Sequence, residues 1–220
     1  MQKLGFGSLC MLLAMAGATR AAVIDFENPP AGLVPNGSYI AGTAVSANAE
    51  LTNQFENLGA IFTTVGGSPF AALIDLGTGH AVSGTNGIGT VDKNGNLDYT
   101  LDLDIFLVVP GTLTPAVTDS ISIQGDEISI PGNVVFSAYD VNGNLLGSGT
   151  LPDTPGGTYA LSDPGIHEFR LHSTSGTVAY DNLSFDVPTN PNGASPVPEP
   201  TTVWFSGLAG AVIFMWKRKS

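Results

Sequence analysis

Short apolar runs recur through the middle of the chain, and Gly, Pro and Asn separate them. Several runs alternate with polar residues: Phe169 and Leu171 alternate with Glu168, Arg170 and His172, the period of a half-buried strand. No stretch has the periodicity of a long amphipathic helix. The pattern predicts strands over residues 23–27, 60–65, 71–76, 98–109, 120–130, 134–141, 145–151, 166–173 and 177–187. Many short strands with turn signals between them predict an all-β fold, an antiparallel β-sandwich.

The two ends of the chain break this pattern. Lys3 precedes an apolar stretch over residues 4–16 and small residues follow, so residues 1–21 are predicted to be a secretory signal peptide. Cleavage after Ala18 or after Ala21 satisfies the small-residue rule. The only cysteine, Cys10, lies inside this segment, so the exported product has no disulfide.

The C-terminal end has three parts. A Pro-rich linker is expected over residues 188–196, followed by the motif Val197-Pro198-Glu199-Pro200. An apolar run over residues 203–216 then leads to the basic end Lys217, Arg218 and Lys219. At about 1.5 Å per residue this run makes roughly 21 Å of helix, a marginal span for a hydrocarbon core of about 30 Å. The basic residues favour a cytoplasmic C-terminus; a permanent anchor and a buried core helix are the alternatives.

The Pro-Glu-Pro motif, apolar helix and basic end together resemble the PEP-CTERM sorting signal of exopolysaccharide-producing Gram-negative bacteria. In that family a membrane protease, exosortase, cuts at or near the motif. The resemblance implies export, transient anchoring in the inner membrane, and then release to the cell surface or extracellular matrix. It implies a structural or adhesive role associated with exopolysaccharide.

Charge is strongly asymmetric once both ends are removed. Only Lys93 and Arg170 lie between residues 22 and 200, against nineteen acidic residues, a net charge of minus 17. Such a surface repels nucleic acid and anionic lipid and attracts divalent cations. Acidic composition also keeps an extracellular protein soluble, which explains the charge without any ligand.

One domain is expected over residues 22–187, which is enough chain for a single core. It opens with Asp25-Phe26-Glu27 and closes with Tyr180-Asp181-Asn182-Leu-Ser-Phe. This pairing resembles jelly-roll carbohydrate-binding modules and many PEP-CTERM ectodomains. The resemblance implies a structural Ca²⁺ held by Glu27 and Asp181 with backbone carbonyls. The alternative is that both carboxylates cap strand ends or bond to turns.

Two segments, Asp92-Lys-Asn94-Gly-Asn96 and Asp140-Val-Asn142-Gly-Asn144, share a pattern. Asn-Gly between strands predicts tight hairpins with type I′ turns. Oxygen-bearing residues at alternate positions also suit calcium loops, although the glycine stands at the fourth position rather than the sixth that an EF-hand loop requires.

Catalytic motifs are sparse. His80, His167 and His172 lack metal-ligand spacing, and the acidic pairs Asp102 with Asp104 and Asp126 with Glu127 are expected by chance in so acidic a chain. The tyrosines that could form a sugar platform, Tyr39, Tyr99, Tyr139 and Tyr159, are dispersed. We therefore expect a protein that is not an enzyme, with a carbohydrate-binding module as the alternative to a structural role and a glycoside hydrolase as the less favoured one.

Overall fold

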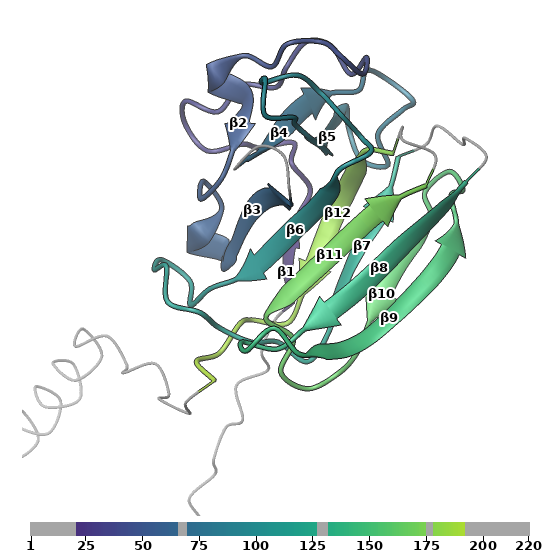
Figure 1. The fold of residues 1–220 in the computed structure, drawn as a ribbon. Helices are drawn as coiled ribbons and strands as arrows, with labels where there is room; N and C mark the ends of the chain where they lie inside the picture. Colours follow the sequence, from purple (N-terminus) through teal and green to yellow (C-terminus); the bar gives the residue numbers. More distant parts are fainter. Residues whose placement is uncertain (1–20, 66–69, 127–131, 175–177, 192–220) are drawn as a thin grey trace, which may run out of the picture.

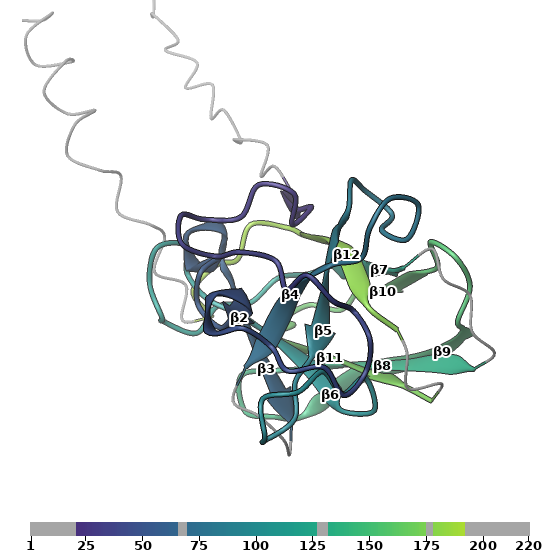
Figure 2. The ribbon, with the colours of Figure 1, turned by 90° about the horizontal axis from the view of Figure 1, so that it is seen from above.

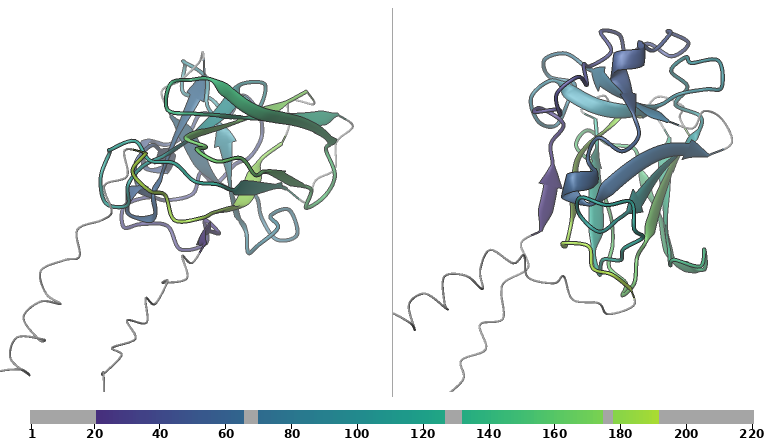
Figure 3. Two further views of the ribbon diagram at one scale, coloured as in Figure 1. Left: turned by 90° about the horizontal axis from the view of Figure 1, so that it is seen from below. Right: turned by 90° about the vertical axis from the view of Figure 1, so that its left-hand side faces the viewer.

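Two antiparallel β-sheets pack face to face in the computed structural model, which describes residues 21–65, 70–126, 132–174 and 178–191 (Figure 1). The first sheet has the order β10 (Thr158–Leu161), β7 (Ile121–Gly125), β12 (Tyr180–Phe185), β5 (Asn86–Thr90), β4 (Ala71–Asp75) and β2 (Glu50–Leu51), with β1 (Ala22–Ile24) also paired to β12. The second has the order β3 (Ala60–Val65), β6 (Asp102–Leu107), β11 (Glu168–Ser173), β8 (Asn133–Tyr139) and β9 (Leu145–Pro152). The side view in Figure 3 separates the two layers. Two short 3₁₀ turns, η1 (Ala47–Ala49) and η2 (Glu56–Leu58), complete the described elements.

The last eight strands wind as a jelly roll. Strands β5, β12, β7 and β10 are neighbours in one sheet, and β6, β11, β8 and β9 are neighbours in the other. Successive strands thus alternate between the layers except at the β8–β9 hairpin, as in the double Greek key of jelly rolls. This order confirms the predicted antiparallel, jelly-roll-like β-sandwich.

Aromatic side chains fill the space between the sheets. Phe136 lies 5.9 Å from Tyr159 and 6.3 Å from Phe169, measured between ring centroids. Phe26 packs edge-on against Phe55 and Phe62 at 5.6 and 5.9 Å. Each such buried side chain contributes roughly 1.5–3 kcal/mol relative to an exposed one. The alternating residues of β7, β8, β11 and β12 supply part of this core, as their pattern predicts.

A second apolar layer covers the outer side of β4 and β5. Its residues are Ala72, Ile74, Leu76, Ala81, Val91, Leu97, Tyr99 and Ala179. The segment before β2 lies over this layer, where the Tyr99 hydroxyl donates a hydrogen bond to the Tyr39 carbonyl at 2.7 Å. Figure 2 shows these N-terminal loops lying across β4 and β5. Both strands are consequently buried on both faces.

The sequence pattern did not predict three of the strands, β2, β5 and β10. Strand β5 has the sequence Asn-Gly-Ile-Gly-Thr, and its glycines look like breaks in a strand. Both are needed, because a Cβ on Gly87 would lie 2.9 Å from the Tyr180 carbonyl and one on Gly89 would lie 2.4 Å from Ile74. Strands β10 and β2 are short and show no clear alternation.

Some predicted boundaries are wrong for local reasons. The strand predicted over residues 23–27 ends at Ile24, because Phe26 takes a φ of 59°. The strand predicted over residues 98–109 begins only at Asp102, because the Asp98 carboxylate accepts the backbone N–H of Thr100 and closes a turn. The strand predicted over residues 120–130 is described only as far as Gly125.

The two Asp-x-Asn-Gly-Asn segments form tight turns, but not type I′ turns. Gly95 and Gly143 have φ near 80°, whereas Asn94 and Asn142 are not among the described non-glycine residues with positive φ. The geometry matches a type I turn followed by a left-handed glycine. In each turn the aspartate accepts two backbone N–H groups, those of residues i+2 and i+4. These hydrogen bonds lower the pKa of Asp140 to about 2, with the Asn144 side chain as the largest cause.

The expected signal peptide, sorting motif, transmembrane run and basic end lie outside the described residues, apart from Ala21. So does most of the expected linker. Within the described ranges there is no helix that is both long and apolar enough to cross a bilayer.

Candidate functional site

The outward face of the second sheet carries a row of polar side chains. Cross-strand pairing aligns Thr63 with Asp104, Asp104 with Arg170, Arg170 with Ser137, and Ser137 with Ser148. This row crosses all five strands and is therefore about 19 Å wide at about 4.8 Å per strand. We call these five residues, with the flanking Asp102, Glu168, His172 and Tyr139, the polar face.

Arg170 is the centre of the polar face. Its Nε donates to Asp104 Oδ1 and its Nη2 donates to Glu168 Oε1, both at 2.8 Å. Its guanidinium carbon lies 5.2 Å from the centroid of the Tyr139 ring. Two carboxylates and an aromatic ring thus hold the guanidinium in place, and its side chain is still 32% exposed.

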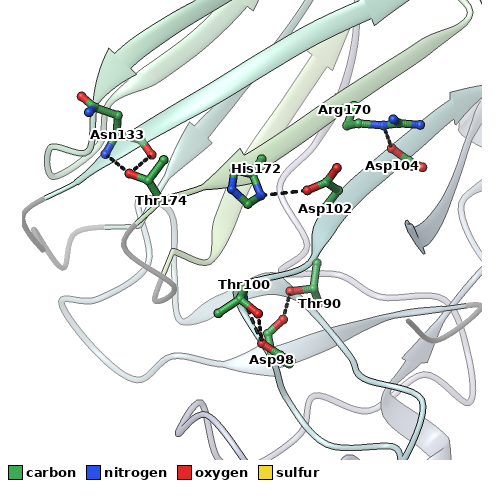
Figure 4. A network of polar contacts seen from close by, with 9 residues as sticks. All are labelled: Thr90, Asp98, Thr100, Asp102, Asp104, Asn133, Arg170, His172 and Thr174. Atoms are coloured by element: carbon green, nitrogen blue, oxygen red, sulfur yellow. Dashed lines mark hydrogen bonds and ion pairs between the residues drawn. The ribbon is translucent and has the colours of Figure 1, made fainter. Parts of the chain in front are cut away.

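A second polar pair lies one row away on the same strands. His172 Nδ1 is 2.8 Å from Asp102 Oδ1, and the two side chains are 43% and 30% exposed. Figure 4 shows both pairs, with Arg170 and His172 of β11 facing Asp104 and Asp102 of β6. Asp102 and Asp104 thus lie on one face of β6.

Asp104 is the most buried member of the polar face, at 2% exposure. Burial raises its pKa to about 6, although the hydrogen bond and charge of Arg170 act in the opposite direction. Desolvation therefore outweighs the ion pair for this carboxylate.

Aromatic rings lie at one end of the polar face. Glu168 pairs with Phe106 of β6 on one side and with Tyr139 of β8 on the other. Both rings are half-buried. The face therefore combines charged hydrogen-bonding groups with apolar ring surface.

The two carboxylates predicted to hold calcium meet at a junction on the other sheet. Along this edge of β12, Tyr180 pairs with β5, and residues 183–185 then pair with β1. Glu27 follows β1, Asp181 lies in β12, and the loop of residues 83–86 leads into β5, which begins at Asn86.

Both junction carboxylates bind this loop. Glu27 Oε1 accepts the N–H groups of Thr85 and Asn86 at 3.0 and 2.7 Å. Asp181 Oδ2 accepts the N–H and the hydroxyl of Ser83 at 2.7 and 3.0 Å. The sequence left open the alternative that both carboxylates bond to a turn, and these hydrogen bonds are of that kind.

The junction also fits a cation in charge and ligand type. No basic side chain pairs with Glu27 or Asp181 in the part of the chain that the structure describes. Asp181 is fully buried; burial raises its pKa, and the charge of Glu27 raises it further. Glu27 Oε2 accepts no hydrogen bond from any described residue. Calcium prefers such carboxylate oxygens together with backbone carbonyls.

Backbone strain flanks both carboxylates. Phe26 and Asn182 are the non-glycine residues with positive φ among those described, at 59° and 49°, and they adjoin Glu27 and Asp181. The pairing of β12 with β7 shifts register between Asp181 and Ser184. Asn tolerates a positive φ better than most residues, whereas nothing about Phe26 as a residue type predicts one.

The other predicted candidates are dispersed. Tyr99 and Tyr159 are core residues, whereas Tyr39 is 39% exposed. His167 Nδ1 lies 2.9 Å from the Ala116 carbonyl, and the His80 ring lies 5.8 Å from the Tyr39 ring. Asp126 is buried beside the Ala179 N–H, and Glu127 lies outside the described residues. The described residues contain no group of three or more His, Cys, Asp or Glu that could hold a metal.

No family model matches the sequence, and no curated protein is significantly similar to it. Solved structures with a similar fold include a DUF4465 family protein from Bacteroides caccae, at 12% identity and a TM-score of 0.41, covering 76% of this chain and 98% of that one. Another is the C-terminal CBM6 of LamC, a laminarinase from Zobellia galactanivorans, at 14% identity and a TM-score of 0.32, covering 58% and 98%. A third is TmCBM61 in complex with β-1,4-galactotriose, at 11% identity and a TM-score of 0.31, covering 65% and 93%. Similarity this low assigns neither a family nor a ligand to this chain.

Proposed function

We propose that this protein is an exported carbohydrate-binding module that binds a neutral glycan chain on its polar face. The observation that carries this proposal is the row from Thr63 to Ser148, which presents oriented polar groups across five strands beside an aromatic ring. A sugar offers the complement, because each ring has hydroxyl groups around its edge and C–H groups on its faces.

Arg170 is suited to hold sugar hydroxyls. Among the described residues, Asp104 and Glu168 accept two of its five N–H groups, which leaves donors for a ligand. Because the guanidinium is already held in position, little side-chain entropy is lost when it binds. Asp102 and Glu168 supply acceptors on either side, and the Tyr139 ring supplies apolar surface.

Charge selects against acidic polysaccharides. On the polar face Asp102, Asp104 and Glu168 outnumber Arg170, and the whole domain is strongly acidic. A uronate polymer would be repelled at long range, whereas a neutral glycan would not.

Affinity electrophoresis through gels that contain neutral or uronate polysaccharides tests this proposal. We expect retardation by at least one neutral glucan, galactan or mannan and none by polygalacturonate. Tyr139→Ala should weaken binding about tenfold, since truncating an aromatic anchor costs more than about 1 kcal/mol. Val23→Ala is the matched control, because Val23 is 59% exposed on the other sheet. Equal loss in both variants, or binding to polygalacturonate alone, contradicts the proposal.

A hydrolase is the less favoured alternative. Asp102 and Asp104 share a strand face, and the raised pKa of Asp104 resembles that of a general acid. However, Asp104 is buried and its Oδ1 accepts a hydrogen bond from Arg170, so it does not reach a glycosidic oxygen. We therefore expect no release of reducing ends from a glycan that the protein binds.

We also propose that Glu27 and Asp181 hold a structural Ca²⁺. An ion bound at one hundred times its dissociation constant adds about 2.7 kcal/mol of stability, which corresponds to about 5–11 °C in melting temperature for a domain of this size. EDTA should lower the melting temperature by such an amount in the wild type and leave Glu27→Gln unchanged. A wild-type melt that EDTA does not alter removes calcium from the proposal.

Finally, we propose that exosortase processes the C-terminal signal after export. The support is the sequence alone: Val197-Pro198-Glu199-Pro200, the apolar run and the basic end. In the host, Glu199→Gln should leave folding intact and block processing. Intact-mass measurement checks processing, and circular dichroism checks folding. A chain that still ends at Ser220 in the wild type would indicate a permanent anchor.

A further inference from the structure

A small pocket lies beyond the end of β4, in the sheet opposite the polar face. Gly37, Ser38, Tyr39 and Ile40 form one wall, and Asp75, Leu76 and Gly77 form the other. Its volume is about 280 Å³. Because β4 belongs to the first sheet and the polar face to the second, the pocket is a separate site.

The walls of the pocket are held by the fold. Asn36 forms a bridge with Ile74 of β4, and the Tyr99 hydroxyl binds the Tyr39 carbonyl at 2.7 Å. The Asn36 side chain donates to the Ser38 carbonyl at 2.8 Å. These contacts involve backbone atoms of the pocket loop, so the loop is positioned without help from its exposed side chains.

The exposed side chains of the pocket are of two kinds. Tyr39 and Ile40 are apolar and exposed, at 39% and 66%. The Tyr39 ring packs against the His80 ring, with the two ring centroids 5.8 Å apart. Asp75 is also exposed, and its Oδ1 accepts the Gly77 N–H at 2.9 Å while Oδ2 accepts no hydrogen bond from a described residue. The lining of the pocket thus includes both an apolar ring and a carboxylate acceptor.

This combination indicates the class of ligand. The volume of the pocket lies just below the roughly 300–1,000 Å³ of sites for drug-sized molecules. It therefore suits one sugar ring rather than a chain of several sugars. A pyranose ring can place its C–H face on Tyr39 and donate a hydroxyl to Asp75. The pocket's own charge is Asp75, so an anionic sugar is disfavoured.

We propose that this pocket is a second glycan site, which binds a single neutral pyranose unit such as a chain end. The inference rests on the proposed function only in taking the ligand to be a glycan. With the polar face on the opposite sheet, one molecule could then hold two glycan segments at once.

Saturation-transfer NMR on the whole protein tests this inference, with methyl β-glucopyranoside, methyl β-galactopyranoside and methyl α-mannopyranoside as probes. At least one probe should give saturable transfer. Tyr39→Ala should weaken it about tenfold, because an aromatic anchor is lost while the backbone carbonyl that Tyr99 binds remains. Asp75→Asn keeps the shape of the side chain and should weaken binding less.

Two control variants separate this site from the polar face. Leu113→Ala removes an apolar side chain that is 62% exposed, against 39% for Tyr39, from another loop and should have no effect. Tyr139→Ala should leave transfer to the probes unchanged. Transfer that is lost in Tyr139→Ala and retained in Tyr39→Ala overturns the pocket but supports the polar face. If no probe gives transfer while polysaccharide still binds, only the pocket is overturned; if neither binds, both proposals are wrong.

Discussion

Gly84 provides a quantitative test of the junction between β1, β5 and β12. It has a φ of 53°, and a Cβ built on it would lie 2.1 Å from Cδ and 2.2 Å from Oε2 of Glu27. Gly84→Ala must therefore displace the Glu27 carboxylate. That carboxylate accepts the Thr85 and Asn86 N–H groups, so the substitution disturbs the loop that also binds Asp181.

The expected cost has two parts. A left-handed alanine costs about 1–2 kcal/mol. Weakening two hydrogen bonds to a charged acceptor adds about 2–4 kcal/mol, since each is worth about 1.5–3 kcal/mol and water recovers part of it. Gly84→Ala should therefore lower the free energy of unfolding by about 3–6 kcal/mol.

Gly79→Ala is the matched control. Gly79 has a φ of 81°, and a Cβ there would meet nothing within 4 Å, so only the backbone cost should remain. Urea unfolding in EDTA measures both variants, and the midpoint should shift with little change in slope. In a Glu27→Ala background the two substitutions should cost the same. Equal costs in the wild-type background would refute the contact between Gly84 and Glu27.

Three further outcomes are expected. Because the folded-state pKa of Asp104, about 6, exceeds its ordinary value of 3.8, stability should fall as pH rises from about 4 to about 6, by up to about 3 kcal/mol. Asp104→Asn resembles the neutral form and should abolish this dependence of stability on pH, measured by urea unfolding at pH 4 and pH 7. An unchanged dependence would show that Asp104 titrates normally. Gly149→Ala should cost about 1–3 kcal/mol, because its Cβ would lie 2.4 Å from the buried Phe136 ring, and an unaltered melt would contradict that packing. His172→Ala should weaken glycan binding with little loss of stability, since its hydrogen bond with Asp102 joins two partly exposed side chains, and calorimetry with the preferred polysaccharide measures the change.

The alternation of apolar and polar residues predicted the strands well wherever one strand face meets the core and the other meets solvent. Strands β8 and β11 show this, with Phe136, Phe169 and Leu171 buried and Ser137, Arg170 and His172 facing outward. It failed at β5, because a strand buried on both faces does not alternate and its glycines serve close packing rather than a turn. Without β5 and β10 the jelly-roll order could not be worked out from the strands alone.

The candidate site was predictable in part. The strand at residues 168–173 places Glu168, Arg170 and His172 on one face, but which strands lie beside it depends on register between segments far apart in the sequence. Local pattern carries no information on that register. The Glu27 and Asp181 junction followed from resemblance. Its donors Ser83, Thr85 and Asn86 bind through backbone N–H groups, which no residue type reveals, and only Ser83 adds its side-chain hydroxyl.

Amide chemical-shift mapping with a neutral oligosaccharide of the preferred polysaccharide tests the central claim most directly. We expect saturable shifts along the polar face, at Asp104, Ser137 and Arg170 on three adjacent strands. Shifts confined to other surfaces, or no shifts with any neutral oligosaccharide, would contradict a glycan site on this sheet.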